Sequence, residues 1–169
     1  IMFDVLDGRE GWQIARDMEK DDGTYAMLKR GVSGLRLGSL NESERQQCSD
    51  DVLASYDMAL DRLRLMGAEI ITFENPVSYG DMADDNGMIT AVEAFHNHGY
   101  LYKNPDLPMD EDVRARMLSG GRYHAHDYFG ILQQRKETMQ AFGESMRGFD
   151  ALVMPSSTST APIITEVDK

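Results

Sequence analysis

The chain has 169 residues, of which 17 are lysine or arginine and 29 are aspartate or glutamate, so its formal net charge is −12. This balance disfavours a nucleic-acid-binding surface, because phosphate contacts need clustered lysine and arginine, and the sequence contains no such cluster. No apolar run reaches the length of a membrane span. The single cysteine, Cys48, excludes an internal disulfide and fits a reducing compartment, so we expect a cytoplasmic protein.

Both ends of the sequence suggest a piece of a larger protein. Residues 1–6 have the apolar spacing of the last turns of an amphipathic helix, and residues 12–18 predict one or two further helical turns. The first residue is Ile1 rather than an initiator methionine, and Lys169 follows a loop without a closing element. We therefore expect a fragment.

A strand, a helix and a second strand are predicted between residues 34 and 73. Leu35, Leu37 and Leu40 alternate with polar residues, which is typical of a short strand with one buried face. Ser49 is a good N-cap for a helix that ends at Gly67. The buried stripe of this helix is expected to comprise Val52, Leu53, Tyr56, Ala59, Leu60 and Leu63. Residues 68–73 form the second strand, and such a β-α-β crossover makes the two strands parallel.

The middle of the chain is predicted to be helical. Pro76 stops the second strand, and residues 81–86 are expected to form an acidic turn. The next helix places Met88, Ile89, Val92 and Phe95 on one side. A loop between Pro105 and Pro108 leads to a short helix capped by Asp110, which the glycines after Ser119 terminate.

Residues 122–162 predict a long helix, a strand and a polar loop. Apolar residues with helical spacing indicate one buried face: Ala125, Tyr128, Phe129, Leu132, Met139, Phe142, Met146 and Phe149. Gly148 allows a left-handed stop, and residues 151–154 read as a strand buried on both faces. Pro155 ends that strand, and residues 156–160 form a hydroxyl-rich loop at its carboxyl end, where ligands of open α/β sheets bind.

This alternation of strands and helices predicts an α/β fold with a mixed β-sheet covered by helices. Several motifs also resemble one family in their order. They are Gly34-Leu35-Arg36-Leu37-Gly38, Leu65-Met66-Gly67-Ala68-Glu69-Ile70, Glu93-Ala94, Asp127-Tyr128, Arg135, Phe142, Phe149-Asp150-Ala151-Leu152-Val153-Met154-Pro155 and Ala161-Pro162. In order and spacing, from about residue 1 to residue 162, the chain resembles the second half of the amidase signature family of serine hydrolases.

The resemblance implies a carbon–nitrogen (carboxamide) hydrolase that works through a serine acyl-enzyme, with a lysine and a second serine passing the proton and no cofactor. Those three residues belong to a glycine- and serine-rich stretch that would precede residue 1. Ser119 is not a substitute, because Met117 stands where the second serine would have to be. We therefore expect residues 1–169 to be a fragment of a single amidase domain, without the catalytic Ser-Ser-Lys part and inactive alone.

Ser156, Ser157 and Thr158 are the candidate substrate-binding residues. By themselves they form a serine/threonine turn after a strand. The resemblance implies that their loop lies beside the acyl-binding cleft, where hydroxyl groups could hold a substrate amide. The implied partners are a small-molecule amide and the remainder of the amidase domain, and a homo-oligomer is left open.

Two other functions within the same fold are left open. One is an amidotransferase subunit that releases ammonia from glutamine, and the other is a non-catalytic scaffold member of the family. A metal-binding module is a third alternative, because His96 and His98, and His124 and His126, form two His-x-His pairs. Both pairs fall in helical patterns, where residues two apart cannot hold one ion together, although one histidine from each pair could still meet in space. We expect no metal site.

The adjacent acidic residues Asp21-Asp22, Asp50-Asp51 and Asp84-Asp85 are interpreted as turn and cap residues rather than as catalytic carboxylates.

Overall fold

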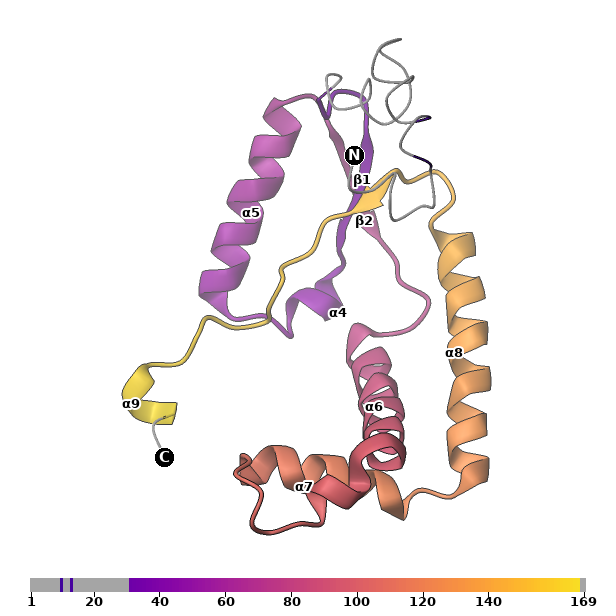
Figure 1. Ribbon diagram of the computed structural model, residues 1–169. Helices are drawn as coiled ribbons and strands as arrows, with labels where there is room; N and C mark the ends of the chain where they lie inside the picture. The colour runs from indigo at the N-terminus through magenta and orange to yellow at the C-terminus, as the bar shows by residue number, and fades with distance from the viewer. Residues whose placement is uncertain (1–9, 11–12, 14–30, 168–169) are drawn as a thin grey trace. The chain divides into compact units, whose positions relative to one another are not determined.

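The computed structural model describes residues 10, 13 and 31–167, so the helical turns predicted before residue 31 lie outside it. In chain order the elements are β1 (Arg36–Leu40), α4 (Glu42–Arg45), α5 (Asp50–Leu65), β2 (Glu69–Phe73), α6 (Tyr79–Tyr102), α7 (Glu111–Ser119), a 3-10 turn (Gly120–Arg122), α8 (Ala125–Ser145), β3 (Ala151–Leu152) and α9 (Ile164–Val167) (Figure 1). The described residues divide into a sheet unit, residues 31–40, 45–73 and 148–167, and a helical unit, residues 41–44 and 74–147.

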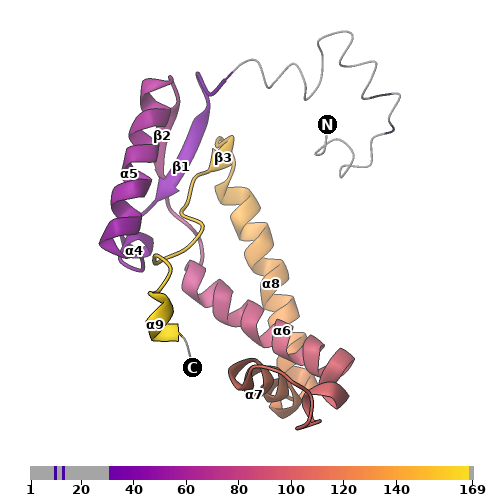
Figure 2. The ribbon, with the colours of Figure 1, turned by 60° about the vertical axis from the view of Figure 1, so that its left-hand side comes forward.

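The sheet unit confirms the α/β fold class and the β-α-β crossover at about residues 34–73. Its strands lie in the order β2-β1-β3, and β1 pairs in parallel with both neighbours, so that Leu37 is opposite Ile70 and Ala151. Figures 1 and 2 show α5, which connects β1 to β2, lying beside these two strands. The carboxyl ends of β1 and β3 therefore meet at one edge of the sheet.

The alternating burial predicted for β1 is wrong. Residues 37–40 are all buried, because β1 is the central strand and is covered on both faces. Glycine suits residue 38, since an added Cβ would run into the Leu152 side chain of β3 and would lie 3.1 Å from the Cβ of Phe73 and 3.3 Å from the ring of Phe149. Those two rings meet edge to face at a centroid distance of 5.4 Å. A side chain at residue 38 would displace the residues that pack around it in the core of the sheet unit.

Helix α5 follows the prediction closely. Ser49 occupies the N-cap position, Asp50 and Asp51 stand in the first turn where the helix dipole favours anions, and Gly67 has φ +95° just beyond the end. Tyr56 and Leu60 are buried, at 5% and 3% exposure. Ala59, which was expected in the buried stripe, is exposed.

In the helical unit, the acidic turn predicted for residues 81–86 is wrong, because these residues belong to α6. The Ser78 hydroxyl accepts the N–H groups of Gly80 and Asp81 at 3.0 and 3.4 Å, so the helix starts before the predicted turn rather than after it. Acidic residues at a helix start are favoured by its dipole, so the same charges that suggested a turn stabilise the first turns of α6.

Helix α7 begins as predicted, since the Asp110 carboxylate accepts the N–H groups of Asp112 and Val113 at 2.8 and 3.2 Å. The glycines that follow Ser119 do more than end a helix. A Cβ at Gly120 would run into the backbone of Ala91 in α6, and a Cβ at Gly121 would meet the Phe95 ring. They allow the 3-10 turn to lie directly on α6.

Helix α8 is confirmed, and Gly148 beyond it has φ +88°. The buried face predicted for it is wrong: none of its residues is buried, and Phe129 and Met139 are 67% and 65% exposed. In the part of the chain that the structure describes, α8 packs chiefly on α6, which covers only part of its apolar stripe. The strand predicted at residues 151–154 is also less buried than expected. Only Ala151–Leu152 pair, at the sheet edge, and Met154 is 46% exposed.

Arg114 holds the loop between α6 and α7. Its side chain is 10% exposed, and its guanidinium donates to the carbonyl groups of Tyr102, Asn104 and Leu107 at 2.7 to 2.9 Å. It also pairs with Glu111 at 2.9 Å. One buried cation thereby satisfies backbone groups that the loop leaves without helical partners.

Arg114→Met should lower the free energy of unfolding by about 2–4 kcal/mol, because three carbonyl groups lose their donor in a partly buried place. Arg116→Met, at an exposed position in the same helix, is the matched control and should cost less than about 0.5 kcal/mol. Urea unfolding of the two variants and the parent measures the difference. Equal, small effects would mean that solvent replaces the guanidinium without cost.

Candidate functional site

The hydroxyl-rich loop, residues 156–160, is held at the carboxyl edge of the sheet by backbone pairing of the segment before it. The N–H of Asp150 donates to the carbonyl of Arg36 at 2.8 Å, and the N–H of Val153 donates to that of Gly38 at 2.8 Å. The N–H of Arg36 donates to the Asp150 carboxylate at 2.7 Å. These bonds fix where the loop begins.

Tyr56 ties this edge to α5. Its hydroxyl accepts the N–H of Leu40 at 2.9 Å and donates to the carbonyl of Val153 at 2.8 Å. Burial of the ring and hydroxyl raises the pKa of Tyr56 above its ordinary value of about 10, so the hydroxyl stays protonated near neutral pH. The bond to the carbonyl of Val153 needs the phenolic proton, so this contact persists in the physiological range.

The three predicted substrate-binding residues lie together on this exposed loop. The N–H of Ser49 donates to the carbonyl of Thr158 at 2.8 Å, which anchors the loop on the start of α5. The Ser157 hydroxyl donates to the carbonyl of Ser159 at 2.8 Å, and Ser156, Ser157 and Thr158 are all exposed. Because the Ser157 proton goes to a backbone carbonyl and not to a base, Ser157 is not arranged as a nucleophile.

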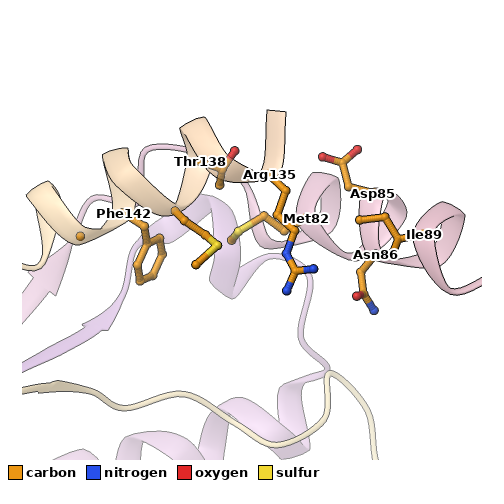
Figure 3. A pocket seen from close by; sticks show the side chains of 9 residues that line it. Met82, Asp85, Asn86, Ile89, Arg135, Thr138 and Phe142 are labelled. Atoms are coloured by element: carbon orange, nitrogen blue, oxygen red, sulfur yellow. The ribbon is translucent and has the colours of Figure 1, made fainter. Parts of the chain in front are cut away.

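A cavity of about 510 Å³ lies within the helical unit, between α6 and α8 (Figure 3). Its lining residues are Met82, Asp85, Asn86, Ile89, Arg135, Thr138, Met139, Phe142 and Gly143. The size and the mainly apolar lining with a few polar groups are typical of a small-molecule site. The sequence does not predict this cavity, because a turn is expected at residues 81–86, which the structure places in α6. The spacing of Met82, Asp85 and Ile89, at i, i+3 and i+7, was the signal that could have found it.

Polar contacts between α6 and α8 fix the walls of this cavity. Gln134 donates its amide to the Asp85 carboxylate at 3.1 Å, and the Tyr128 hydroxyl donates to Glu93 at 2.8 Å. The hydrogen bond to Glu93 raises the pKa of Tyr128, because that bond requires the phenolic proton. At the other end of the helix pair, the rings of Tyr79 and Phe142 lie 6.5 Å apart.

The histidine pairs are placed as follows. His96 and His98 lie in α6, while the rings of His124 and His126 stack at the start of α8, with centroids 5.6 Å apart. Among residues 31–167 no three His, Cys, Asp or Glu side chains are grouped as ligands for one metal ion. Asp50 and Asp51 stand in the first turn of α5, whereas Asp21 and Asp22 lie outside the described residues. Of the helices that the structure describes, none is long and apolar enough to span a membrane.

Comparison with known proteins identifies a family. A sequence model described as "Amidase" matches residues 1–169. The chain is 25% identical over 142 residues to an amidase of Pseudomonas putida, covering 83% of this chain and 30% of the relative. It is 24% identical over 168 residues to a glutamyl-tRNA(Gln) amidotransferase subunit of Brachyspira hyodysenteriae, covering 85% and 35%. The chain thus spans about a third of the length of these curated relatives.

Solved structures agree at the level of the fold. A crystal structure of an amidase superposes with a TM-score of 0.69 at 21% identity, covering 79% of this chain and 30% of the other. An inhibitor-bound structure described as a vestigial protein complex that reveals the evolutionary origins of an s-triazine catabolic enzyme gives 0.69 at 22% identity, covering 83% and 30%. A glutamyl-tRNA(Gln) amidotransferase subunit of Thermotoga maritima gives 0.52 at 19% identity, with the same coverages.

Tyr56→Phe should lower the free energy of unfolding by about 1–3 kcal/mol, because the N–H of Leu40 and the carbonyl of Val153 both lose a buried partner. Since the folded-state pKa of Tyr56 is raised, its contribution is fully present below about pH 10 and is lost as the pH rises through the folded-state value. Urea unfolding between pH 8 and about pH 11 should therefore show a steeper alkaline loss in the parent than in the variant. Parallel pH profiles would contradict this role of Tyr56.

Proposed function

This chain belongs to the amidase family, and we propose that it is part of an enzyme that hydrolyses carboxamide carbon–nitrogen bonds through a serine acyl-enzyme. The observation that carries the proposal is the family match over residues 1–169, which the superposition on a solved amidase supports. Residues 1–169 would be a fragment of a single amidase domain. They would supply a sheet, covering helices and part of the substrate cleft.

In the proposed reaction a serine attacks the carboxamide carbon, and a lysine with a second serine moves the proton to the departing nitrogen. Water then attacks the acyl-enzyme and releases the acid. Backbone N–H groups near the nucleophile would stabilise the oxyanion. All of these groups would lie in a part of the domain outside residues 1–169, so this segment alone would be inactive. It involves no metal or organic cofactor.

The hydroxyl-rich loop would contact the substrate amide. In support, Ser156, Ser157 and Thr158 are exposed at the carboxyl edge of parallel strands, and the loop is anchored through Ser49 and Tyr56. The Ser157 hydroxyl donates to the carbonyl of Ser159 and accepts the N–H of Ser159 at 3.4 Å, so its oxygen keeps one lone pair for a substrate N–H. Among the side chains that the structure describes, none bonds to the hydroxyls of Ser156 and Thr158, which can donate or accept.

A glutamine amidotransferase subunit that releases ammonia is the second candidate, favoured by the similarity to the amidotransferase subunit of Brachyspira hyodysenteriae. Ammonia release from free glutamine, in preference to other carboxamides, would support it. A non-catalytic scaffold is the third candidate, and failure to release ammonia from any carboxamide would support that one. The cytoplasmic location and a homo-oligomer remain predictions.

Ser157→Ala and Thr158→Ala, made in the complete protein, should raise KM by about 3- to 10-fold, because each removes one hydrogen bond to the substrate amide. The expected change in kcat is less than about 2-fold, since neither hydroxyl takes part in bond cleavage. Ser55→Ala is the matched control, because its exposed hydroxyl in α5 only contacts the carbonyl of Asp51. Steady-state ammonia release measures all three. An equal fall in kcat and kcat/KM with unchanged KM would contradict the binding role.

A further inference from the structure

The cavity between α6 and α8 has an apolar wall made of Met82, Ile89, Met139 and Phe142. Thioether and aromatic side chains adapt their shape to a compact apolar body at little cost. Met139 is 65% exposed whereas Ile89 is 5% exposed, so the described residues leave the wall open to a ligand at Met139. The wall alone would accept many apolar groups, and selectivity has to come from the polar residues beside it.

Arg135 supplies the charge at this cavity. The chain carries 29 acidic against 17 basic residues, yet none of the carboxylates whose side chains the structure describes forms an ion pair with Arg135. Asp85, the acidic residue of the lining, accepts the amide of Gln134 instead. In Figure 3 the guanidinium of Arg135 and the amide of Asn86 project to the same side of the helix pair, while the Asp85 carboxylate projects to the other. The cation is therefore available to an anion.

Gly143 keeps one end of the cavity open. A Cβ built there meets no atom within 4 Å, and its φ is not in the left-handed region. Neither crowding nor backbone conformation within the described residues requires glycine at this place in α8, where glycine costs about 1 kcal/mol relative to alanine. Because Gly143 lines the cavity and a Cβ there has open space, we expect a larger side chain at 143 to extend into the cavity.

We propose that the α6–α8 cavity binds an organic monocarboxylate with a compact apolar body. Arg135 and the Asn86 amide bind the carboxylate. The apolar wall formed by Met82, Ile89, Met139 and Phe142 contacts the apolar part of the ligand. A guanidinium presents paired N–H donors to a carboxylate, which gives the site its preference for an acid over a neutral molecule of the same shape. Binding needs no turnover, so the site is independent of the proposed hydrolysis.

The experiment is calorimetric titration of the complete protein with 3-phenylpropionate, and with 3-phenylpropan-1-ol as its neutral counterpart. The parent protein should bind the acid saturably and at least about 10-fold more tightly than the alcohol. Arg135→Gln should remove that preference, because it should lower the affinity for the acid by about 10-fold. Lys136→Gln is the matched control, since it removes an adjacent cation that does not line the cavity, and it should change the affinity by less than about 2-fold.

Gly143→Leu should abolish binding of both molecules by filling the cavity. Gly130→Leu is its control, because Gly130 lies in the same helix with equally open space around it but outside the cavity. Leucine favours a helix more than glycine does, so neither variant should lose thermal stability, and loss of binding would not reflect unfolding.

Failure of the parent to bind the acid would overturn the proposal. Equal affinity for acid and alcohol, or equal effects of Gly143→Leu and Gly130→Leu, would also overturn it. Binding without amide hydrolysis would refute the proposed function alone, whereas hydrolysis without binding of the acid would refute this inference alone.

Discussion

The hydroxyl group of Tyr56 joins three segments that are far apart in the sequence. It accepts from the end of β1, donates to the residue after β3, and belongs to the helix that connects β1 to β2. Since β3 contains only two paired residues, its position depends on such contacts more than on its own ladder. The hydroxyl-rich loop follows directly, so the place of the proposed substrate contacts is set by one buried phenol and by the pairing of Arg36 with Asp150.

The sequence predicted those features that are determined by neighbouring residues, and it failed for those that depend on contacts between distant segments. Caps and stops at Ser49, Gly67, Asp110 and Gly148 were found, because each acts within a few residues of itself. The burial of α8 and of residues 151–154 was overestimated. Apolar spacing identifies the apolar face of an element, but it does not show whether another element packs against that face. The cavity was not predicted for a related reason. Its walls come from α6 and α8, which are far apart in the sequence, and α6 begins before the turn predicted at residues 81–86.

The family and the site rest on different kinds of observation. Family membership follows from the sequence model that matches residues 1–169, and the short motifs between residues 34 and 162 and the superposed folds agree with it. The candidate site follows from a few side chains whose types are common in turns. A fold hosts many chemistries, so substrate choice has to be argued from the residues of the loop and not from the fold. The loop and the α6–α8 cavity differ in character, since one offers small hydroxyl groups and the other an apolar wall with a cation.

The most direct test of the central claim is to trap the acyl-enzyme. The complete protein would be mixed with a carboxamide, quenched in acid during turnover, digested and analysed by mass spectrometry. We expect an acyl group on a serine outside residues 1–169, formed without added metal ions. An acyl group on Ser119, Ser157 or any other residue of this segment, or hydrolysis that proceeds only with a metal ion and without an adduct, would contradict the claim.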